Sequence, residues 1–140
     1  DVNVSTSMIW GCLWDETLQW LVDSGAKTYA EIADSTSWGN YNNSTFEYKT
    51  NTSGSTSTKS TSSSTRIPSG STEYSKANNI YDMAGNVWDW TLEGNGSYNR
   101  RYRGGYYGSS GSNYPASYRD RSNPDFSYYL IGFRSYLYIK

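Results

Sequence analysis

Apolar residues fall into a few separated patches along the chain, and the clearest patch lies near the N-terminus. Trp14, Leu18, Leu21 and Val22 recur at helical spacing, with a glycine at position 25. A single apolar stripe at this spacing predicts an amphipathic helix over about residues 13–24 that packs on the core. Residues 2–10 suggest an extended entry to this helix, and the short segment 29–33 is ambiguous.

The last segment of the chain alternates between apolar and other residues. Ile131, Phe133, Leu137 and Ile139 fall on one face of an extended chain, and the residues between them fall on the other. Alternation of this kind predicts a half-buried C-terminal strand. Residues 100–107 also suggest a strand, interrupted by two glycines.

Residues 34–73 form the weakest part of the pattern. From residue 50 to residue 72 the chain is almost entirely Ser, Thr, Gly, Asn and Lys. Such a run buries too little apolar area to offset the entropy lost on ordering. A long surface loop is therefore expected here.

The densest run of special residues is NIYDMAGNVWDW at positions 79–90. Gly85 and Asn86 predict a turn, because both residue types tolerate positive φ. Trp88 and Trp90 are two positions apart and share one face of a strand. Both tryptophans are expected to anchor the core.

Composition limits the chemistry that is available. The 140 residues suit one domain, and they include no His and a single Cys. This excludes an internal disulfide, a Cys-cluster metal site and the Ser-His and Cys-His nucleophile pairs. Cys12 is expected to be a buried, inert thiol. No apolar run reaches the length of a membrane span and no signal peptide is evident, so membrane insertion is not expected.

Charge and residue types change sharply after residue 93. Residues 1–93 carry a net charge of −6, whereas residues 94–140 carry +5. Residues 1–93 include 18 Lys, Glu, Gln, Trp and Met, so residues 94–139 should contain about nine of them; they contain none. These five types share the property that none has a codon ending in a pyrimidine. Replacement of adenines in Asn codons never produces them, although simple compositional bias would also leave them out.

Three motifs in order resemble the signature of formylglycine-generating enzyme (sulfatase-modifying factor) domains. They are the run at 79–90, the triplet RGG at 103–105 and the triplet GFR at 132–134. This resemblance implies an α+β fold of C-type lectin-like type with much irregular loop. The family's catalysis needs a Cys pair late in the domain, and this tail has no Cys. No enzyme activity is therefore expected.

The chain also resembles the variable proteins of diversity-generating retroelements, which share this fold and these motifs. In that group, adenine-directed mutagenesis rewrites selected codons near the C-terminus. The resemblance implies a scaffold in residues 1–93 and a variable display region in residues 94–140 that ends in a core strand. It implies a macromolecular ligand, such as a cell-surface protein or glycan. It also implies a place on a phage tail or bacterial surface, and assembly as a homotrimer.

Two alternatives remain open. One is an undiversified lectin-fold module that binds carbohydrate or serves a structural role. The other is a degenerate formylglycine-generating enzyme homologue with residual activity. Nucleic-acid binding is not expected, because the whole chain is acidic and has no Lys cluster and no RNA-binding signature.

The tail has the Tyr, Ser, Gly and Asn composition of antibody paratopes, which combines large contact area with adaptable hydrogen bonding. The predicted ligand contacts are Tyr98, Tyr102, Tyr106, Tyr107, Ser109, Ser110, Tyr114, Tyr118, Asp120, Ser122, Asp125, Phe126, Tyr128, Tyr129 and Leu130. The arginines divide into two groups. Structural ion pairs or carbonyl contacts are expected for Arg103 and Arg134. An exposed positive rim is expected from Arg100, Arg101, Arg119 and Arg121.

A calcium site is the one metal site that the resemblance implies. Its ligands would be the carboxylates of Asp82 and Asp89 with the carbonyls of Gly85 and Val87, a set of oxygens that suits Ca²⁺. The alternative is that both aspartates cap turns or form ion pairs. No cofactor is expected to be required.

Overall fold

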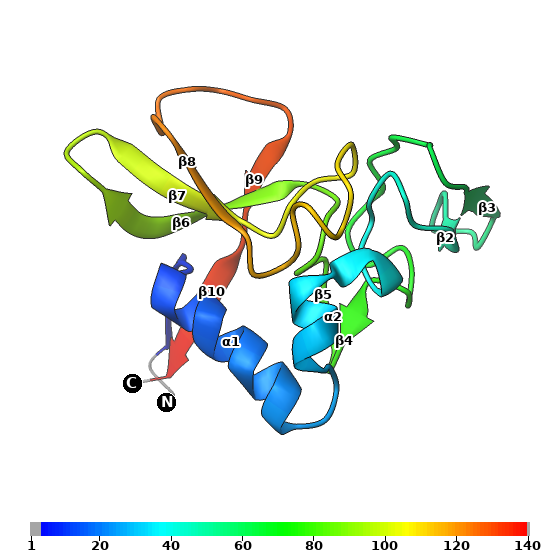
Figure 1. Ribbon diagram of the computed structural model, residues 1–140, viewed down its shortest axis with the longest axis horizontal. Helices are drawn as coiled ribbons and strands as arrows, with labels where there is room; N and C mark the ends of the chain where they lie inside the picture. The colour runs from blue at the N-terminus through cyan, green and yellow to red at the C-terminus, as the bar shows by residue number, and fades with distance from the viewer. Residues whose placement is uncertain (1–3, 140) are drawn as a thin grey trace.

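The computed structural model describes residues 4–139, so the residue at position 2 of the expected extended entry lies outside the described part. Within these residues two helices, one short 3-10 helix and ten strands follow one another, and Figure 1 shows how they are arranged. In order they are β1 (Val4–Met8), α1 (Gly11–Asp23), α2 (Tyr29–Ala33), η1 (Ser35–Ser37), β2 (Phe46–Lys49), β3 (Thr56–Lys59), β4 (Lys76–Ala77), β5 (Ile80–Tyr81), β6 (Trp88–Asn95), β7 (Asn99–Arg103), β8 (Arg119–Ser122), β9 (Ile131–Phe133) and β10 (Ser135–Ile139).

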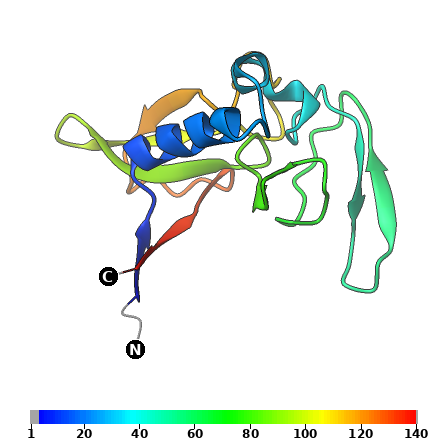
Figure 2. The ribbon, with the colours of Figure 1, turned by 90° about the horizontal axis from the view of Figure 1, so that it is seen from below.

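Four strands form the central sheet, in the order β8-β7-β6-β9. Its neighbours are antiparallel, except that β6 and β9 run parallel. Three two-stranded ribbons surround it: β1 with β10, β2 with β3, and β4 with β5. Figure 2 shows the β1–β10 ribbon and the β2–β3 hairpin extending from opposite ends of the body. Within residues 4–139, no helix has the length and apolar character needed to cross a membrane.

Helix α1 carries the apolar stripe that its sequence predicts. Trp14, Leu18 and Leu21 are buried, and the Trp14 indole N–H donates to the Ala116 carbonyl at 2.9 Å. The helix begins at Gly11, two residues earlier than expected. A Cβ at Gly11 would lie 2.1 Å from the Glu93 carboxylate, so glycine lets the start of the helix approach β6 closely.

The expectation that Cys12 is buried is wrong, because its thiol is exposed. Position 12 lies next to Gly11 and away from the stripe that continues to Trp14 and Leu18, so its side chain faces solvent. Tryptophan burial is also uneven. Trp14, Trp38 and Trp88 are buried, whereas Trp10 and Trp20 are about half exposed at 47% and 49%.

Charged side chains fill the space between α1 and the sheet. Arg103 is only 1% exposed and donates to the Asp15 carboxylate, while Arg119 Nη2 reaches the other oxygen of Asp15 at 2.5 Å. The Glu93 carboxylate lies 3.5 Å from Arg119 Nη1 and 4.0 Å from Arg103 Nη1. Burial lowers the pKa of Arg103, and its Asp15 partner opposes that shift. The expected structural role of Arg103 is confirmed.

The run at 79–90 forms β5, a tight turn and the start of β6. Gly85 and Asn86 have φ of 72° and 64°, as the sequence predicts. A Cβ at Gly85 would lie 2.3 Å from the Asn40 carbonyl oxygen. The Asn86 side chain accepts from the Ile67 N–H and donates to the Ile67 carbonyl, both at 3.1 Å. The turn therefore ties the Ser/Thr-rich segment to the core.

The prediction that residues 50–72 form only a surface loop is partly wrong. Strand β3 lies within this range and pairs with β2. At its end Lys59 is 2% exposed and donates to the carbonyls of Tyr41 and Ser44, the latter at 2.9 Å. Burial lowers the pKa of the Lys59 ammonium. These tertiary contacts order a segment that has little apolar area of its own.

The predicted single C-terminal strand is broken at Arg134 into β9 and β10. Arg134 turns inward and donates from Nε to the Asp89 carboxylate at 2.9 Å. Strand β10 then leaves the sheet and pairs with β1, and Leu137 does not reach the core. Phe133 and Leu137 are 68% and 56% exposed, which contradicts the expected half-buried face. The side chains of Tyr138 and Ile139 fall outside what the structure describes.

Candidate ligand-binding surface

The central sheet has two different faces. Asp89, Arg103 and Arg119 form one cross-strand row, and their contacts with Asp15 and Arg134 place that row toward α1. The next row joins Trp90, Tyr102 and Asp120. Because neighbouring residues of a strand point to opposite faces, this second row lies on the face away from α1. That face and its flanking loops carry the Tyr-rich side chains.

Trp88 is the centre of this outer face. Its side chain is 6% exposed and lies beneath four tyrosines, with ring centroids 4.9 Å from Tyr102, 5.7 Å from Tyr114, 5.9 Å from Tyr118 and 6.0 Å from Tyr106. Edge and tilted contacts at these distances stabilise aromatic pairs beyond their buried area. The expectation that Trp88 anchors the core is confirmed. The four tyrosines form a layer between this anchor and solvent.

Trp90 differs from its neighbour. It is only half buried, and its ring packs edge-on against Tyr102 at 5.3 Å between centroids. The sequence predicts that both tryptophans are core anchors, and for Trp90 the structure supports this only in part. It belongs to the outer face and borders solvent.

The loop from residue 104 to residue 118 is held by scaffold groups that bind its main chain. Asn42 reaches two of its carbonyls: the Asn42 N–H donates to Ser109 O at 2.9 Å and its side chain to Gly108 O at 3.1 Å. The Gly111 N–H donates to the Asn43 side chain at 3.1 Å. The Ala116 N–H donates to the buried Ser35 hydroxyl at 3.0 Å. None of these bonds depends on a side chain of the loop.

The start of this loop depends on two adjacent glycines. Gly104 and Gly105 have φ of 91° and 77°, which side-chain-bearing residues rarely adopt. A Cβ at Gly105 would lie 2.2 Å from the Tyr114 carbonyl oxygen. The Gly104 carbonyl accepts from the Tyr41 hydroxyl at 2.8 Å and from the Gly85 N–H at 2.7 Å. A main-chain hydrogen bond thus joins the RGG triplet at 103–105 directly to the motif at 79–90.

A second aromatic group lies in the connection between β8 and β9. Phe126, Tyr128 and Tyr129 are 59%, 43% and 67% exposed, with neighbouring centroids 5.9 and 5.0 Å apart. Tyr128 and Tyr129 both face outward, as a loop allows and a regular strand would not. Tyr98, in the turn between β6 and β7, is 82% exposed.

Burial changes the ionisation of the tyrosine layer. Desolvation, with the nearby carboxylate of Asp120, raises the pKa of Tyr102 to about 12. Desolvation also raises the pKa of Tyr106, with smaller contributions from Tyr114 and from Tyr128 of the second aromatic group. The hydroxyls of Tyr102 and Tyr106 therefore remain neutral donors and acceptors at physiological pH.

Two of the residues predicted to contact a ligand, Ser109 and Leu130, are buried in the structure. Ser109 is 6% exposed and donates from its hydroxyl to the Tyr106 carbonyl at 2.8 Å, which fixes the turn. Leu130 is 7% exposed, and its carbonyl accepts from the Trp88 N–H at the start of the β6–β9 pairing. Both serve the backbone of the surface rather than its exposed face.

The remaining predicted contacts are at least partly exposed. Those most open to solvent are Tyr98, Tyr118, Asp125, Phe126, Tyr128 and Tyr129. Those partly covered are Tyr102, Tyr106, Tyr107, Ser110, Tyr114, Asp120 and Ser122. Every tyrosine of the predicted set thus reaches the surface, and ligand contact by each stays a prediction.

The expected positive rim is formed in part. Arg119 and Arg121 are exposed, but Arg119 is paired with Asp15 and Glu93. Arg100 and Arg101 are half buried, and Arg101 donates to the Asn95 side chain at 2.8 Å.

The two aspartates expected to bind calcium are bonded instead to serine and arginine side chains. The Asp82 carboxylate accepts from the hydroxyls of Ser69 and Ser75 at 2.6 and 2.7 Å. Arg134 bonds the Asp89 carboxylate and donates to the Asp82 carbonyl at 3.0 Å. Burial raises the pKa of Asp89 and Arg134 opposes that rise. A guanidinium between the two aspartates does not fit a calcium site, and it gives Arg134 the structural role that its motif predicts.

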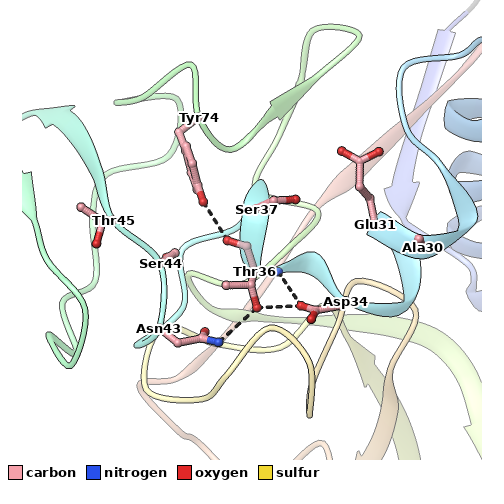
Figure 3. Close-up of a pocket in the computed structure, with 9 residues that line it drawn as sticks. All are labelled: Ala30, Glu31, Asp34, Thr36, Ser37, Asn43, Ser44, Thr45 and Tyr74. Carbon is pink, nitrogen blue, oxygen red and sulfur yellow. Dashed lines mark hydrogen bonds between the residues drawn. The ribbon is translucent and has the colours of Figure 1, made fainter.

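No group of three or more His, Cys, Asp or Glu that could hold a metal occurs within residues 4–139. The groove of about 510 Å³ in Figure 3 is lined by scaffold residues between positions 30 and 74. There Thr36 Oγ1 donates to Asp34 at 2.6 Å and accepts from Asn43 at 3.1 Å, while the Tyr74 hydroxyl donates to Thr36 O at 2.7 Å. These bonds orient Asn43, whose side chain binds the main chain of the loop from residue 104 to residue 118.

The loop-binding residues Ser35, Asn42 and Asn43 were not found from the sequence. They lie in the polar segment 34–43, where nothing distinguishes them from other loop residues. Only their contacts with a segment 66 to 81 residues away reveal their role.

The comparisons with known proteins agree with this geometry. The model of the Sulfatase-modifying factor enzyme 1-like domain matches residues 18–137. Among solved structures, Treponema denticola variable protein 1 is similar, with a TM-score of 0.57 and 20% identity over 96% of this chain and 49% of that one. This chain thus spans about half the length of that neighbour. No curated protein matches the sequence.

The structural likeness confirms the α+β, C-type lectin-like fold that the motifs predict. The family match covers most of the chain, including all three motifs and the tyrosine layer. The chain belongs to the sulfatase-modifying factor enzyme 1-like family.

Proposed function

We propose that this chain is a non-enzymatic ligand-binding module whose C-terminal aromatic face is diversified by a retroelement. The observation that carries the proposal is the division of labour in the loop from 104 to 118. Scaffold groups hold its main chain, and its aromatic side chains lie toward solvent. Such a surface can change its side chains without changing its backbone.

Two further observations support diversification. The five residue types that adenine replacement in Asn codons never produces are absent from residues 94–139. The solved structure with a similar fold is named a variable protein.

The ligand that suits this surface is a macromolecule, such as a cell-surface protein or glycan. Rigid Tyr and Phe rings supply a large contact area at low entropic cost, as they do in antibody paratopes. We place the module on a phage tail or bacterial surface, where it would act as an adhesin.

The non-enzymatic part of the proposal rests on the nucleophiles that are present. The single Cys is exposed on α1, and the chain has no His. An assay of sulfatase-peptide oxidation should show no product above a Cys12→Ala control. Cys12-dependent product would favour a degenerate modifying enzyme.

The nucleotide sequence of the tail and the DNA near it tests diversification. A near-copy of the tail-coding sequence should occur close by, and the two copies should differ only at adenines of the repeat. The differences should fall in codons of exposed residues such as Tyr98, Tyr118 and Tyr129, and should spare Trp88 and Asp89. The absence of such a repeat would leave an undiversified lectin-fold module.

A further inference from the structure

A separate hollow lies at one end of the outer face. It has a volume of about 250 Å³ and is lined by Met8, Trp90, Thr91, Leu92, Arg100 and Pro124. Its walls are mostly apolar. Of its lining residues only Trp90 belongs to a family motif, and none belongs to the tyrosine layer.

An irregularity in the sheet creates it. The β6–β7 pairing shifts register between Trp90 and Gly94, so the intervening residues leave the ladder. The Leu92 N–H donates instead to the Ile9 carbonyl at 3.0 Å, which brings the end of β1 and Met8 to the hollow. Gly94 pairs with Arg100, and a Cβ there would lie 3.9 Å from Arg100 Nη1.

The charge at this hollow is uncompensated. Arg100 Nη1 donates to the Asn99 carbonyl at 3.1 Å, and Arg100 forms no ion pair with any residue in the range 4–139. An arginine beside an apolar wall presents donors to a carboxylate while its stem adds apolar contact. This complementarity points to a ligand group with an apolar body and an adjacent negative charge.

We propose that this hollow is an anchor pocket for a protein ligand, taking an apolar side chain that has a carboxylate next to it. It is continuous with the display face, because Trp90 packs against Tyr102 at 5.3 Å. Met8, Trp90 and Leu92 belong to the scaffold, whereas Arg100 and Pro124 belong to the tail. Most of the apolar wall is then constant, whereas Arg100 and Pro124 are free to change. As a statement about recognition, this rests on the proposed display function.

Free probes test the pocket without the natural ligand. N-acetylphenylalanine carries the proposed chemistry, and N-acetylphenylalaninamide is its neutral match. Titration is followed by the indole N–H resonances, with the Trp90 signal assigned by Trp90→Phe. Trp10 and Trp20 are about half exposed and do not line the hollow, so they serve as internal controls.

The acid should shift the Trp90 resonance saturably and leave Trp10 and Trp20 in place. It should bind roughly threefold more tightly than the amide, as an exposed ion pair allows. Arg100→Gln should remove that difference, and Leu92→Ala should weaken both probes. Unchanged Trp14 and Trp38 resonances show that each variant is folded.

Equal affinity for acid and amide in the wild type would overturn the proposal, as would a Trp90 shift that grows linearly together with those of Trp10 and Trp20. Either result would leave the proposal of a diversified display face intact, because the DNA repeat tests that separately. Conversely, selective probe binding would stand even if no repeat were found.

Discussion

The main chain at Gly105 passes so close to Tyr114 that only a hydrogen atom fits in place of a side chain. Gly105 also has φ of 77°, so any other residue would add backbone strain to a steric clash. Gly96 provides a comparison, because its φ is 73° but a Cβ there would meet nothing within 4 Å. Comparing substitutions at Gly96 and Gly105 therefore separates the cost of backbone strain from the cost of a steric clash.

Gly96→Ala is expected to lower the free energy of unfolding by about 1 kcal/mol, the cost of a left-handed conformation. Gly105→Ala should cost at least about 2 kcal/mol more, because the Tyr114 carbonyl must move. Urea denaturation of both variants measures the difference. Similar midpoints for the two variants would show that the loop start is not a fixed point.

Tyr102 links the outer face to alkaline stability. Its pKa is raised from 10.0 in the unfolded chain to about 12. Between these values the unfolded chain loses the proton and the folded chain keeps it, so stability falls as pH rises. Tyr102→Phe keeps the ring contacts and removes this titration. A shallower decline in the urea midpoint from pH 10 to pH 12 is expected, and an unchanged slope would contradict it.

The roles of single residues could be predicted from the sequence where a motif limits what the residue type can do. Positive φ at Gly85 and Asn86, and the structural roles of Arg103 and Arg134, could be read from the motifs. Whether Ser109 or Leu130 is exposed could not, because each is covered by groups far away in the chain.

Among the elements, the loop from 104 to 118 depends on bonds from a polar segment with no secondary-structure pattern. Ser35 is fully buried; its hydroxyl accepts from the Ala116 N–H and donates to the Glu31 carbonyl at 2.9 Å. The Ser117 hydroxyl, by contrast, donates to the Ile32 carbonyl at the exposed surface. Ser35 therefore fixes the main chain of the loop, whereas the Ser117 bond lies at its exposed surface.

Ser35→Ala should destabilise the protein by about 1–3 kcal/mol, because the buried Ala116 N–H loses its acceptor. Amide hydrogen exchange at Ala116 should accelerate together with that of its loop neighbours. The matched variant Ser117→Ala should change stability by less than about 0.5 kcal/mol. Unchanged exchange at Ala116 in Ser35→Ala would show that the loop is held without this bond.

Elements with a periodic pattern were predictable, and those defined by tertiary contacts were not. Helix α1 follows from its apolar stripe. Lys59 anchors strand β3 by donating to buried carbonyls. The C-terminal strand is interrupted where Arg134 bonds to Asp89. Neither partner is near in sequence, so neither result has a local signal.

The whole molecule separates a fixed frame from an aromatic surface. The charged layer under α1 and the bonds to the loop main chain occupy one side of the sheet and its flank. The tyrosine layer above Trp88 and the loop that carries Tyr128 occupy the other. Ligand binding by the second part should therefore be independent of the stability provided by the first.

Two libraries measured side by side test that separation most directly. In the display library, an Asn codon with randomised adenines replaces the codon of each of five tail residues. These residues are Tyr98, Tyr107, Phe126, Tyr128 and Tyr129. The matched scaffold library does the same at the buried positions Asn40, Asn86, Trp88, Thr91 and Arg103. The readout is the fraction of displayed members that resist protease. Most display members should resist and few scaffold members should; equal loss of resistance in both libraries would contradict a variable surface on a fixed backbone.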